Sequence, residues 1–475
     1  MRYISTRGTG PALSFDDVLL AGLARDGGLY VPEEWPFLTA QDLRELSGLP
    51  YDQLAARLMK PFVEGSISDD ALFRMTADTY ANHPDRGFLH QAVTPLVQLD
   101  HRFWLMELFH GPTIAFKDYA LQLLGRLFDH VLAKRGERIT IVGATSGDTG
   151  SAAIEACRDR DNLDIFILYP EGRVSDVQRR QMTTVASENV HTIAVKGSFD
   201  DCQALVKAMF NDASFRDAAG LSAVNSINWA RIMAQTVYYV SAGLALGAPD
   251  RRVAFSVPTG NFGNVYAAYA AIQMGLPVEK LIIGSNTNDI LDRFFRSGAM
   301  ESSAVVPTLS PSMDIQISSN FERLLFDLHD RDGGKVTDDM EAFRTTGRFN
   351  LSRSQMDRAQ RLFDSHKLDD DGILATIRTI YERTGQVIDP HTAVGVNAAI
   401  QSEREGDIPS ATPIVALACA HPAKFPDAVA RATGFRPPLP PRLADLFDRP
   451  ERTAVLPADL GAIQSHIKQH GRVFA

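Results

Sequence analysis

Short β-branched runs alternate with amphipathic segments over residues 96 to 220. The strand-like runs are Ile139–Val142, Ile165–Tyr169 and Val190–Val195. Apolar residues recur at helical spacing after each run, from Ser151 to about Arg158, from Ser175 to about Ala186, and at Ala204, Leu205, Met209 and Phe210. Repeated strand–helix units predict a parallel sheet with helices on both faces.

A second strand–helix block follows. Its predicted strands are Val253–Val257 and Leu281–Gly284, and its predicted helices are Asn228–Leu246 and Val265–Met274. Between about 300 and 375 the alternation stops, and two charged segments, Asn320–Asp330 and Ser352–Ser365, have helical patterns. The alternation resumes with a helix over Thr392–Gln401 and a strand over Ile414–Ala418.

These patterns predict an α/β fold with two parallel-sheet domains. Residues 1–95 mix short helices and loops, and form a small N-terminal domain. Residues 96–220 form the first α/β domain, and 221–300 begin the second. Residues 301–375 are a helical insertion, and 376–475 complete the second domain and add a tail after the proline-rich Pro437–Pro441.

Composition narrows the class of protein. With 475 residues, 45% of them hydrophobic, the chain is long enough for several buried cores. Its three cysteines have no metal-ligand spacing and fit a reducing compartment. A net charge of −10 argues against nucleic-acid or anionic-membrane partners, and no apolar run has membrane-spanning length. We therefore expect a cytoplasmic enzyme without a metal, in which any anionic ligand is bound by locally concentrated positive charge.

The segment His110–Tyr119 places Lys117 at the start of a predicted helix. The positive end of a helix repels a lysine charge, and apolar neighbours such as Phe116 lower its pKa by desolvation. A partly neutral lysine can form Schiff bases with carbonyl compounds. The alternative is a surface lysine paired with Asp118 or Glu107.

Glycine-containing loops follow two predicted strands and precede helices, where free backbone NH groups favour anions. Gly260–Asn264 is suited to a phosphate, although a tight strand–helix turn explains it equally well, and it lacks the Walker and dinucleotide-binding spacings. In Gly143–Gly150, Ser146 and Thr149 could hold a carboxylate, and Asp148 would repel one unless turned away or protonated. Helix capping is the alternative for this loop.

Two further groups of residues are candidates for a site. Asn225 and Ser226 precede a helix that carries Arg231 about one turn in, an arrangement suited to a phosphate or carboxylate. Helix capping and a surface arginine would explain it as well. Cys419 and His421 follow the last predicted strand, where a cysteine is usually core packing and a histidine often a structural hydrogen-bonder.

Several segments resemble the long-chain form of the threonine synthase family, pyridoxal phosphate enzymes of the tryptophan-synthase-β fold. The resemblance runs in order along nearly the whole chain, and its segments are Asp26–Pro32, Glu107–Asp118, Thr145–Gly150, Asn225–Asn228, Gly260–Asn264, Ser312–Asp314, Ser319–Arg323, Asp389–Ala393 and Ala420–Phe425. It implies two α/β domains with the cofactor between them, and a monomer.

The resemblance also implies a role for each candidate residue. Lys117 would hold the cofactor and move protons, next to Phe116. Gly260, Asn261, Phe262, Gly263 and Asn264 would hold the cofactor phosphate. Ser146, Asp148 and Thr149 would meet the substrate carboxylate and the cofactor's phenolic oxygen, while Asn225, Ser226 and Arg231 would hold the substrate phosphate. Cys419 matches the position facing the pyridine nitrogen, where threonine or serine is expected, and a thiol is still a neutral, weak donor.

The implied reaction converts O-phospho-L-homoserine and water to L-threonine and phosphate, by γ-elimination and β-addition of water. Closure of one α/β domain over the other is expected to exclude water until phosphate has left. The alternatives are a threonine synthase-like phospho-lyase, a serine or threonine dehydratase giving a 2-oxo acid, and a non-catalytic binding protein of the same fold. A dehydratase has no use for the Arg231 group, and a pure binder has no use for an activated lysine.

Overall fold

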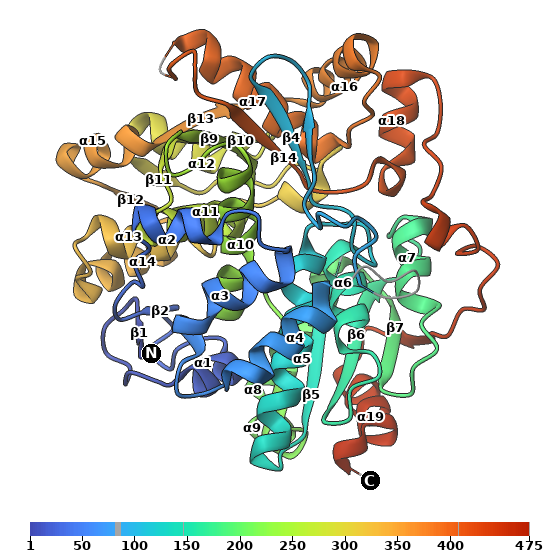
Figure 1. Cartoon of the computed structure of the whole chain (residues 1–475). Helices are drawn as coiled ribbons and strands as arrows, with labels where there is room; N and C mark the ends of the chain where they lie inside the picture. The colour runs from blue at the N-terminus through green and yellow to red at the C-terminus, as the bar shows by residue number, and fades with distance from the viewer. Residues whose placement is uncertain (81–86, 146, 407, 475) are drawn as a thin grey trace.

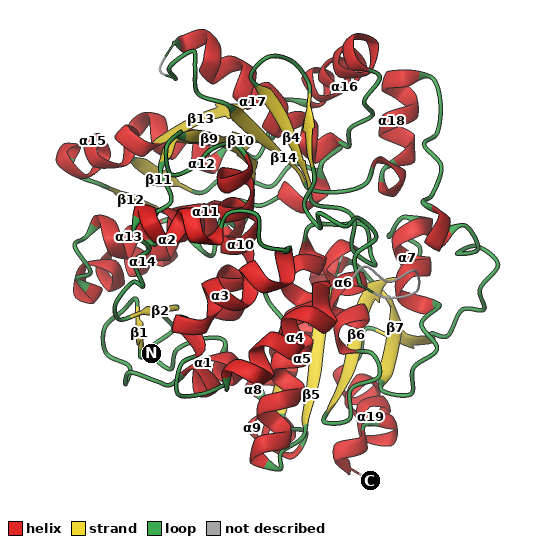
Figure 2. Cartoon of the chain, viewed as in Figure 1, coloured by secondary structure: helices red, strands yellow, loops and turns green. Residues whose placement is uncertain are grey.

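A computed structural model describes residues 1–80, 87–145, 147–406 and 408–474. Two parallel sheets, each covered by helices on both faces, dominate this part of the chain, and the N-terminal segment lies against both (Figure 1, Figure 2). The predicted α/β fold class is confirmed. None of the described helices combines the length and apolarity needed to cross a bilayer.

The first sheet, as far as the chain is described, has five parallel strands in the order β15-β7-β6-β5-β8. The strands are β5 (Ile139–Ala144), β6 (Leu163–Pro170), β7 (Val190–Lys196), β8 (Leu221–Ser222) and β15 (Ala454–Pro457). One face packs on α8 (Phe199–Asn211), α9 (Ala213–Ala218) and α19 (Leu460–His470). The other face packs on α5 (Lys117–Arg135) and α6 (Asp148–Cys157), and α7 (Asp176–Thr183) lies against α6. Successive β-branched and aromatic side chains along these strands pack on opposite faces of the sheet, as expected for strands buried on both sides.

The second sheet has the order β13-β10-β9-β14-β4-β3 among the described residues. Its strands are β3 (Leu96–Gln98), β4 (Phe103–Glu107), β9 (Val253–Pro258), β10 (Val278–Ser285), β13 (Phe363–Lys367) and β14 (Ile414–Ala418), with β3 antiparallel at the edge. The helix α17 (Pro390–Glu405) packs on one face, and α16 (Asp370–Thr384) and α18 (Pro426–Thr433) lie beside it. The helices α10 (Trp229–Ala245), α11 (Gly263–Gln273) and α12 (Ile290–Ser297) cover the other face.

The N-terminal segment packs on α10, the buried helix between the two sheets. Its elements are β1 (Tyr3–Ser5), α1 (Phe15–Ala21), β2 (Tyr30–Pro32), α2 (Ala40–Leu46), α3 (Tyr51–Val63) and α4 (Asp69–Tyr80). Trp229, at the start of α10, contacts the rings of Tyr3, Trp35 and Phe62. These aromatic contacts fix the start of α10 against the N-terminal segment.

The region predicted as a helical insertion contains α13 (Phe321–Leu328), α14 (Gly333–Thr346) and α15 (Arg353–Leu362), and the hairpin β11 (Ala299–Glu301) with β12 (Arg348–Asn350). The helix predicted over Ser352–Ser365 is wrong in its last turn. At Phe363 the backbone becomes extended and begins β13, which pairs with β10. The Phe363 ring joins Phe262 and Phe295 in an aromatic cluster, so tertiary packing overrides the helical pattern.

Four strands lie in a different sheet from the one that the predicted domain boundaries give them: β3 and β4 at the start of the first α/β domain, β8 at the start of the second, and β15 in the tail. The strand β4, expected in the first α/β domain, pairs with β14 in the second sheet. The strand β15, expected with the second domain, pairs with β7 in the first sheet. Long-range strand pairing decides the placement of β4 and β15, and sequence order does not reveal it. The division into domains otherwise stays a prediction.

Candidate active site

Lys117 lies where the chain passes from the second sheet to the first. It is the first residue of α5, and the segment before it is fixed to the end of β14 by backbone bonds. The Phe116 NH donates to the Cys419 carbonyl (2.8 Å), and the His421 NH donates to the Ile114 carbonyl (3.0 Å). Lys117 is therefore anchored on one sheet, while its helix packs against the other.

The Lys117 side chain is buried and contacts polar groups from two other segments. Its Nζ lies 3.4 Å from Asp148 Oδ2 and 3.5 Å from Ser312 Oγ. Burial lowers the pKa of Lys117, the charges of Lys424 and Arg231 lower it further, and Asp148 opposes them. The pairing with Asp118 or Glu107 does not occur, since Asp118 accepts bonds from Thr113 and Glu107 pairs with His110. The amine is thus desolvated, as a nucleophilic lysine requires.

Asp148 is surrounded by donors. Lys424 Nζ (2.8 Å) and Gln178 Nε2 (2.9 Å) reach its Oδ1, while Ser312 Oγ (3.2 Å) and Lys117 Nζ reach its Oδ2. Burial alone would raise the pKa of Asp148, but Lys424 and Lys117 together hold it well below 3.8. A carboxylate that accepts from every neighbour has no proton to donate, so this group is ionised.

The loop Gly260–Asn264 connects β9 to α11 and has the form of an anion cradle. Phe262 has a left-handed backbone (φ 61°), which ends the loop directly at the first turn of α11. A Cβ on Gly260 would lie 3.0 Å from Ile315 and 3.2 Å from the Met313 Cα, so only glycine fits without displacing that segment. The free NH groups of the first turn face this loop, where a phosphate is favoured.

Asn264 presents an unpartnered donor in that first turn. Its Oδ1 accepts from the hydroxyls of Tyr238 (2.5 Å) and Tyr239 (2.8 Å), which fixes the orientation of the amide. Its Nδ2 is buried without a hydrogen-bond partner among the described residues. A buried donor left without a partner costs free energy, so this atom is matched to a ligand.

Arg231 is a second buried group without a partner. It lies on α10 with 5% of its surface exposed, and no described residue accepts a hydrogen bond from its guanidinium or pairs with it. Burial lowers the pKa of Arg231 to about 10, and Tyr238 partly opposes this. A buried, unpaired guanidinium is costly unless an anionic ligand completes it.

Asn225 and Ser226 lie in the segment before α10, and Asn320 ties this segment to the glycine loop. Asn225 Oδ1 accepts from the Ile227 NH (3.2 Å). Asn320 Nδ2 donates to the carbonyls of Ser226 (3.2 Å) and Asn261 (3.0 Å). The two candidate phosphate-binding segments are therefore joined directly, through a residue that the sequence did not single out.

Of the remaining predicted site residues, the structure describes Thr149 and Cys419 but not Ser146. Ser146 lies outside the described residues, and Thr149 lies in the first turn of α6. Cys419 is the first residue after β14. Its NH donates to Thr392 Oγ1 (3.2 Å), and burial raises the pKa of its thiol. The thiol is thus neutral, as a partner for an unprotonated pyridine nitrogen would be.

Sequence reasoning missed Lys424, Ser312 and Gln178 as members of this cluster. Lys424 and Ser312 belong to segments that carry the family resemblance, and Gln178 lies in a predicted helix. Nothing in their spacing shows that all three reach one carboxylate. They come from η2 (Pro422–Lys424), η1 (Pro311–Met313) and α7, which meet only in the folded chain.

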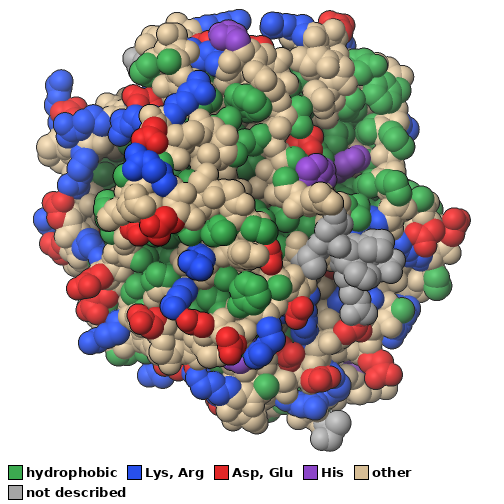
Figure 3. Space-filling model, in the orientation of Figure 1, with side chains coloured by type: hydrophobic (Ala, Val, Ile, Leu, Met, Phe, Trp, Pro, Cys, Tyr) green, Lys and Arg blue, Asp and Glu red, His purple; other side chains and the backbone are tan. Residues whose placement is uncertain are grey.

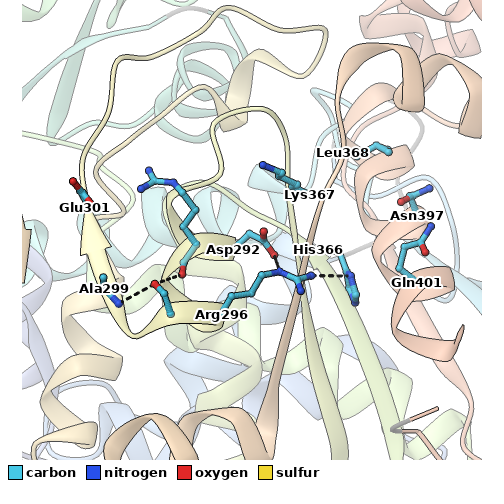
Figure 4. A pocket seen from close by; sticks show the side chains of 11 residues that line it. Asp292, Arg296, Ala299, Glu301, His366, Lys367, Leu368, Asn397 and Gln401 are labelled. Carbon is cyan, nitrogen blue, oxygen red and sulfur yellow. Dashed lines mark hydrogen bonds and ion pairs between the residues drawn. The ribbon is translucent and has the colours of Figure 1, made fainter. Parts of the chain in front are cut away.

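A cavity of about 690 Å³ lies elsewhere, at the carboxyl end of β13 (Figure 4). Its cations are already paired with carboxylates, Arg293 and Lys367 with Asp289 and Arg296 with Asp292. None of the predicted site residues lines it. On the face shown in Figure 3, basic and acidic side chains are interspersed. Among the predicted site residues and their described neighbours, Lys117, Lys424 and Arg231 are buried cations, and Arg231 is the one that no carboxylate pairs with.

Family models match three consecutive parts of the chain. Residues 2–80 match "Threonine synthase N terminus", 88–353 match "Pyridoxal-phosphate dependent enzyme", and 392–467 match "Threonine synthase, C-terminal". Together they cover most of the N-terminal segment, the strands of the first sheet, those of the second sheet except β13, and most of α19.

Relatives similar over their full length carry the same name. A threonine synthase of Pseudomonas aeruginosa is 56% identical, with 99% of each chain covered. The crystal structure of pyridoxal-phosphate-bound threonine synthase from Brucella melitensis is 53% identical with a TM-score of 0.96, covering 99% of this chain and 100% of that one. The structure of threonine synthase from yeast is 41% identical with a TM-score of 0.93, covering 99% and 98%.

The residues present fit pyridoxal phosphate. The desolvated Lys117 suits its aldehyde, and the cradle at Gly260 with the unpartnered Asn264 Nδ2 suits its phosphate. The neutral Cys419 thiol suits its pyridine nitrogen. Arg231 lies beyond these requirements, as a second buried cation available to an anion.

Proposed function

Because the chain belongs to the threonine synthase family, we propose that this site converts O-phospho-L-homoserine and water to L-threonine and phosphate. The chain is a pyridoxal-phosphate-dependent enzyme with threonine synthase function. What the proposal adds is the substrate and the residues that act on it.

The cofactor would be held at three points. Lys117 would bind its aldehyde carbon, beside Phe116. The loop Gly260–Asn264 would bind its phosphate through backbone NH groups and the Asn264 amide, and Cys419 would face the pyridine nitrogen. When bound, pyridoxal phosphate supplies the electron sink that acidifies the proton on the substrate α-carbon.

Lys117 would then act as the proton carrier. As a neutral amine it takes the proton from the α-carbon and afterwards moves a proton at the β-carbon, which allows phosphate to leave from the γ-carbon. A proton is then added at the γ-carbon, which becomes the methyl group, water adds its hydroxyl at the β-carbon and gives up a proton, and the α-carbon is protonated again to give threonine. Thr149 and Ser146 would hold the substrate carboxylate.

The observation that carries the proposal is the unpaired Arg231 guanidinium, buried near Lys117. A cofactor phosphate needs one anion site, and the loop at Gly260 supplies it. Arg231, with Asn225 and Ser226 before the same helix, supplies a second, and a substrate with its own phosphate needs two. A serine or threonine dehydratase acts on a substrate without phosphate, and so would leave Arg231 buried and unpaired.

The test is incubation of the purified enzyme with O-phospho-L-homoserine, followed by identification of the organic product. Threonine and phosphate in equal amounts are expected. Release of 2-oxobutyrate with phosphate would identify the phospho-lyase alternative, because that enzyme differs only in how the intermediate is quenched. Absence of turnover with bound cofactor would favour a binding protein.

Two further properties are proposed, the oligomeric state and the location in the cell. The family resemblance favours a monomer, and the composition favours the cytoplasm. Size-exclusion chromatography with light scattering would test the first, and fractionation of the source cells would test the second.

A further inference from the structure

Lys424 is a lysine with no exposed surface, next to the reacting amine. It ends η2, which a short segment separates from β14, and its Nζ donates to the Thr113 carbonyl (2.9 Å). Its other partner is Asp148 Oδ1, at 2.8 Å. Lysine is rarely buried completely, because desolvating an ammonium group is costly unless the group is paired. The proposed function gives Lys424 no contact with substrate or cofactor.

Asp148 divides its two oxygens between two lysines. Oδ1 accepts from Lys424, and Oδ2 lies 3.4 Å from Lys117. One negative charge therefore has two possible counter-charges, of which the shorter contact is with Lys424. As long as Lys424 is present, Asp148 does not need a proton on Lys117 to remain compensated.

We propose that Lys424 is a positioning residue for the reaction, a buried counter-ion that neutralises Asp148 so that Lys117 is free to lose and regain its proton. The proposal rests on the proposed function, in which Lys117 holds the cofactor and carries protons. Lys424 itself touches neither the substrate nor the reacting carbons.

Other charged or titratable groups lie near Lys117, Lys424 and Asp148. Arg231 acts on Lys117 in the same direction as Lys424, and Asp118 and His421 lie near Lys424. Asp389 and the Cys419 thiol lie on the side of Lys117 and Asp148. Asp118 is held by the Thr113 NH (2.8 Å), and Asp389 by His391 (2.7 Å), so neither contacts Asp148. Among the described residues, Lys424 and Lys117 are the cations paired with Asp148.

If the charge of Lys424 is removed, Lys117 should become the counter-charge of Asp148. In Lys424→Met the aliphatic stem is kept and the ammonium is lost, so the carboxylate stabilises the proton on Lys117 nitrogen. When the visible absorption of the holoenzyme is followed as a function of pH, the midpoint of this titration should move to a higher pH, by about one pH unit or more. We expect kcat to fall by about 10-fold or more, with KM changed by less than about 3-fold, because proton transfer is affected and substrate contacts are not. Lys424→Arg keeps the charge, and should restore most of the wild-type titration.

Gln178→Leu is the matched control. Gln178 Nε2 donates to the same Asp148 Oδ1 at 2.9 Å but carries no charge. If charge is the cause, this variant should shift the titration by less than about a third of the Lys424→Met shift. Equal shifts in the two variants would show that Asp148 placement alone matters, and would overturn the counter-ion role.

A double variant keeps the test decisive if Lys424→Met fails to fold. Asp148→Asn combined with Lys424→Met removes both charges, and should titrate closer to the wild type than Asp148→Asn alone. Borohydride reduction of the wild-type holoenzyme and peptide mapping come first. A label on a lysine other than Lys117 would overturn the proposed function. A label on Lys117, with a titration unmoved in Lys424→Met and a double variant that titrates no closer to the wild type than Asp148→Asn alone, would overturn the Lys424 role alone.

Discussion

The Tyr238 hydroxyl donates to Asn264 Oδ1 across 2.5 Å, from a buried helix to the first turn of the next. Tyr239 donates to the same oxygen. Because both donors occupy the oxygen, the amide nitrogen is turned away from them, and it has no partner in the described part of the chain. Two tyrosines thereby fix the orientation of one unpartnered donor at the end of the glycine loop.

The first prediction concerns that donor. Asn264→Asp keeps an acceptor for both tyrosines but replaces the NH₂ group with an oxygen that repels a phosphate. A hydrogen bond to a charged group contributes roughly 1.5–3 kcal/mol, so we expect the Kd for pyridoxal phosphate to rise by about 10- to 100-fold. Fluorescence titration of the apoenzyme measures it. Tyr239→Phe, which leaves Tyr238 in place, should cost less than the aspartate variant, and equal losses would contradict this account.

The second prediction uses the unpaired Arg231. Arg231→Met should raise KM for O-phospho-L-homoserine by about 100-fold, in line with the 2–5 kcal/mol typical of a buried charge pair that loses one member. The same change should not lower the thermal unfolding midpoint of the substrate-free enzyme, because an uncompensated buried charge is removed.

Arg323 is the matched control for that measurement. It is equally buried on α13, but its guanidinium donates to the carbonyls of Tyr30 (3.0 Å) and Ile227 (2.6 Å). Arg323→Met should therefore lower the midpoint by several degrees. A lower midpoint for Arg231→Met as well would show that Arg231 has a structural role in the absence of substrate.

The third prediction concerns pH. The pKa of Asp148 is depressed in the folded chain, so its ion pair adds stability above the ordinary value of 3.8 and loses it as the pH falls through the folded pKa. Asp148→Asn should reduce the free energy of unfolding by about 3 kcal/mol near pH 7, with Lys424 left unpaired. The difference from the wild type should shrink below pH 4. Urea unfolding of both proteins between pH 7 and 3 tests this, and a difference independent of pH would count against it.

The fourth prediction concerns packing between α5 and α6. A Cβ on Gly125 would overlap the carbonyl oxygen of Ala156, so Gly125→Ala should separate the helix that begins at Lys117 from its neighbour. We expect a loss of about 2 kcal/mol or more in the free energy of unfolding. Gly461→Ala is the same substitution in α19, where the nearest atom is at 3.4 Å. It should be neutral or stabilising by up to about 1 kcal/mol, because alanine is the better helix former.

The sequence predicted well what local pattern determines. The strand–helix alternation located the parallel sheets, and Lys117 begins its helix as expected. The prediction was less accurate where contacts between distant segments determine the structure. The short, polar β13 was predicted as the end of a helix. It forms a strand in the folded chain, where Phe363 packs against other aromatic side chains. From sequence, Asp148 was expected to repel a carboxylate unless turned away or protonated, because its compensating charge comes from Lys424, far along the chain.

The pairing of β4 with β14 has a consequence for how the enzyme is made. Phe103 pairs with Ile414, and the segment before Lys117 is bonded to Cys419 and His421, so these contacts join the first quarter of the chain to its last part. Contacts so distant in sequence form slowly, and during synthesis they must wait until most of the chain has left the ribosome. The contacts that position Lys117 therefore form late in folding. A polypeptide that ends before β14 lacks the strand and the backbone partners that hold this segment, so it cannot place Lys117 in this way.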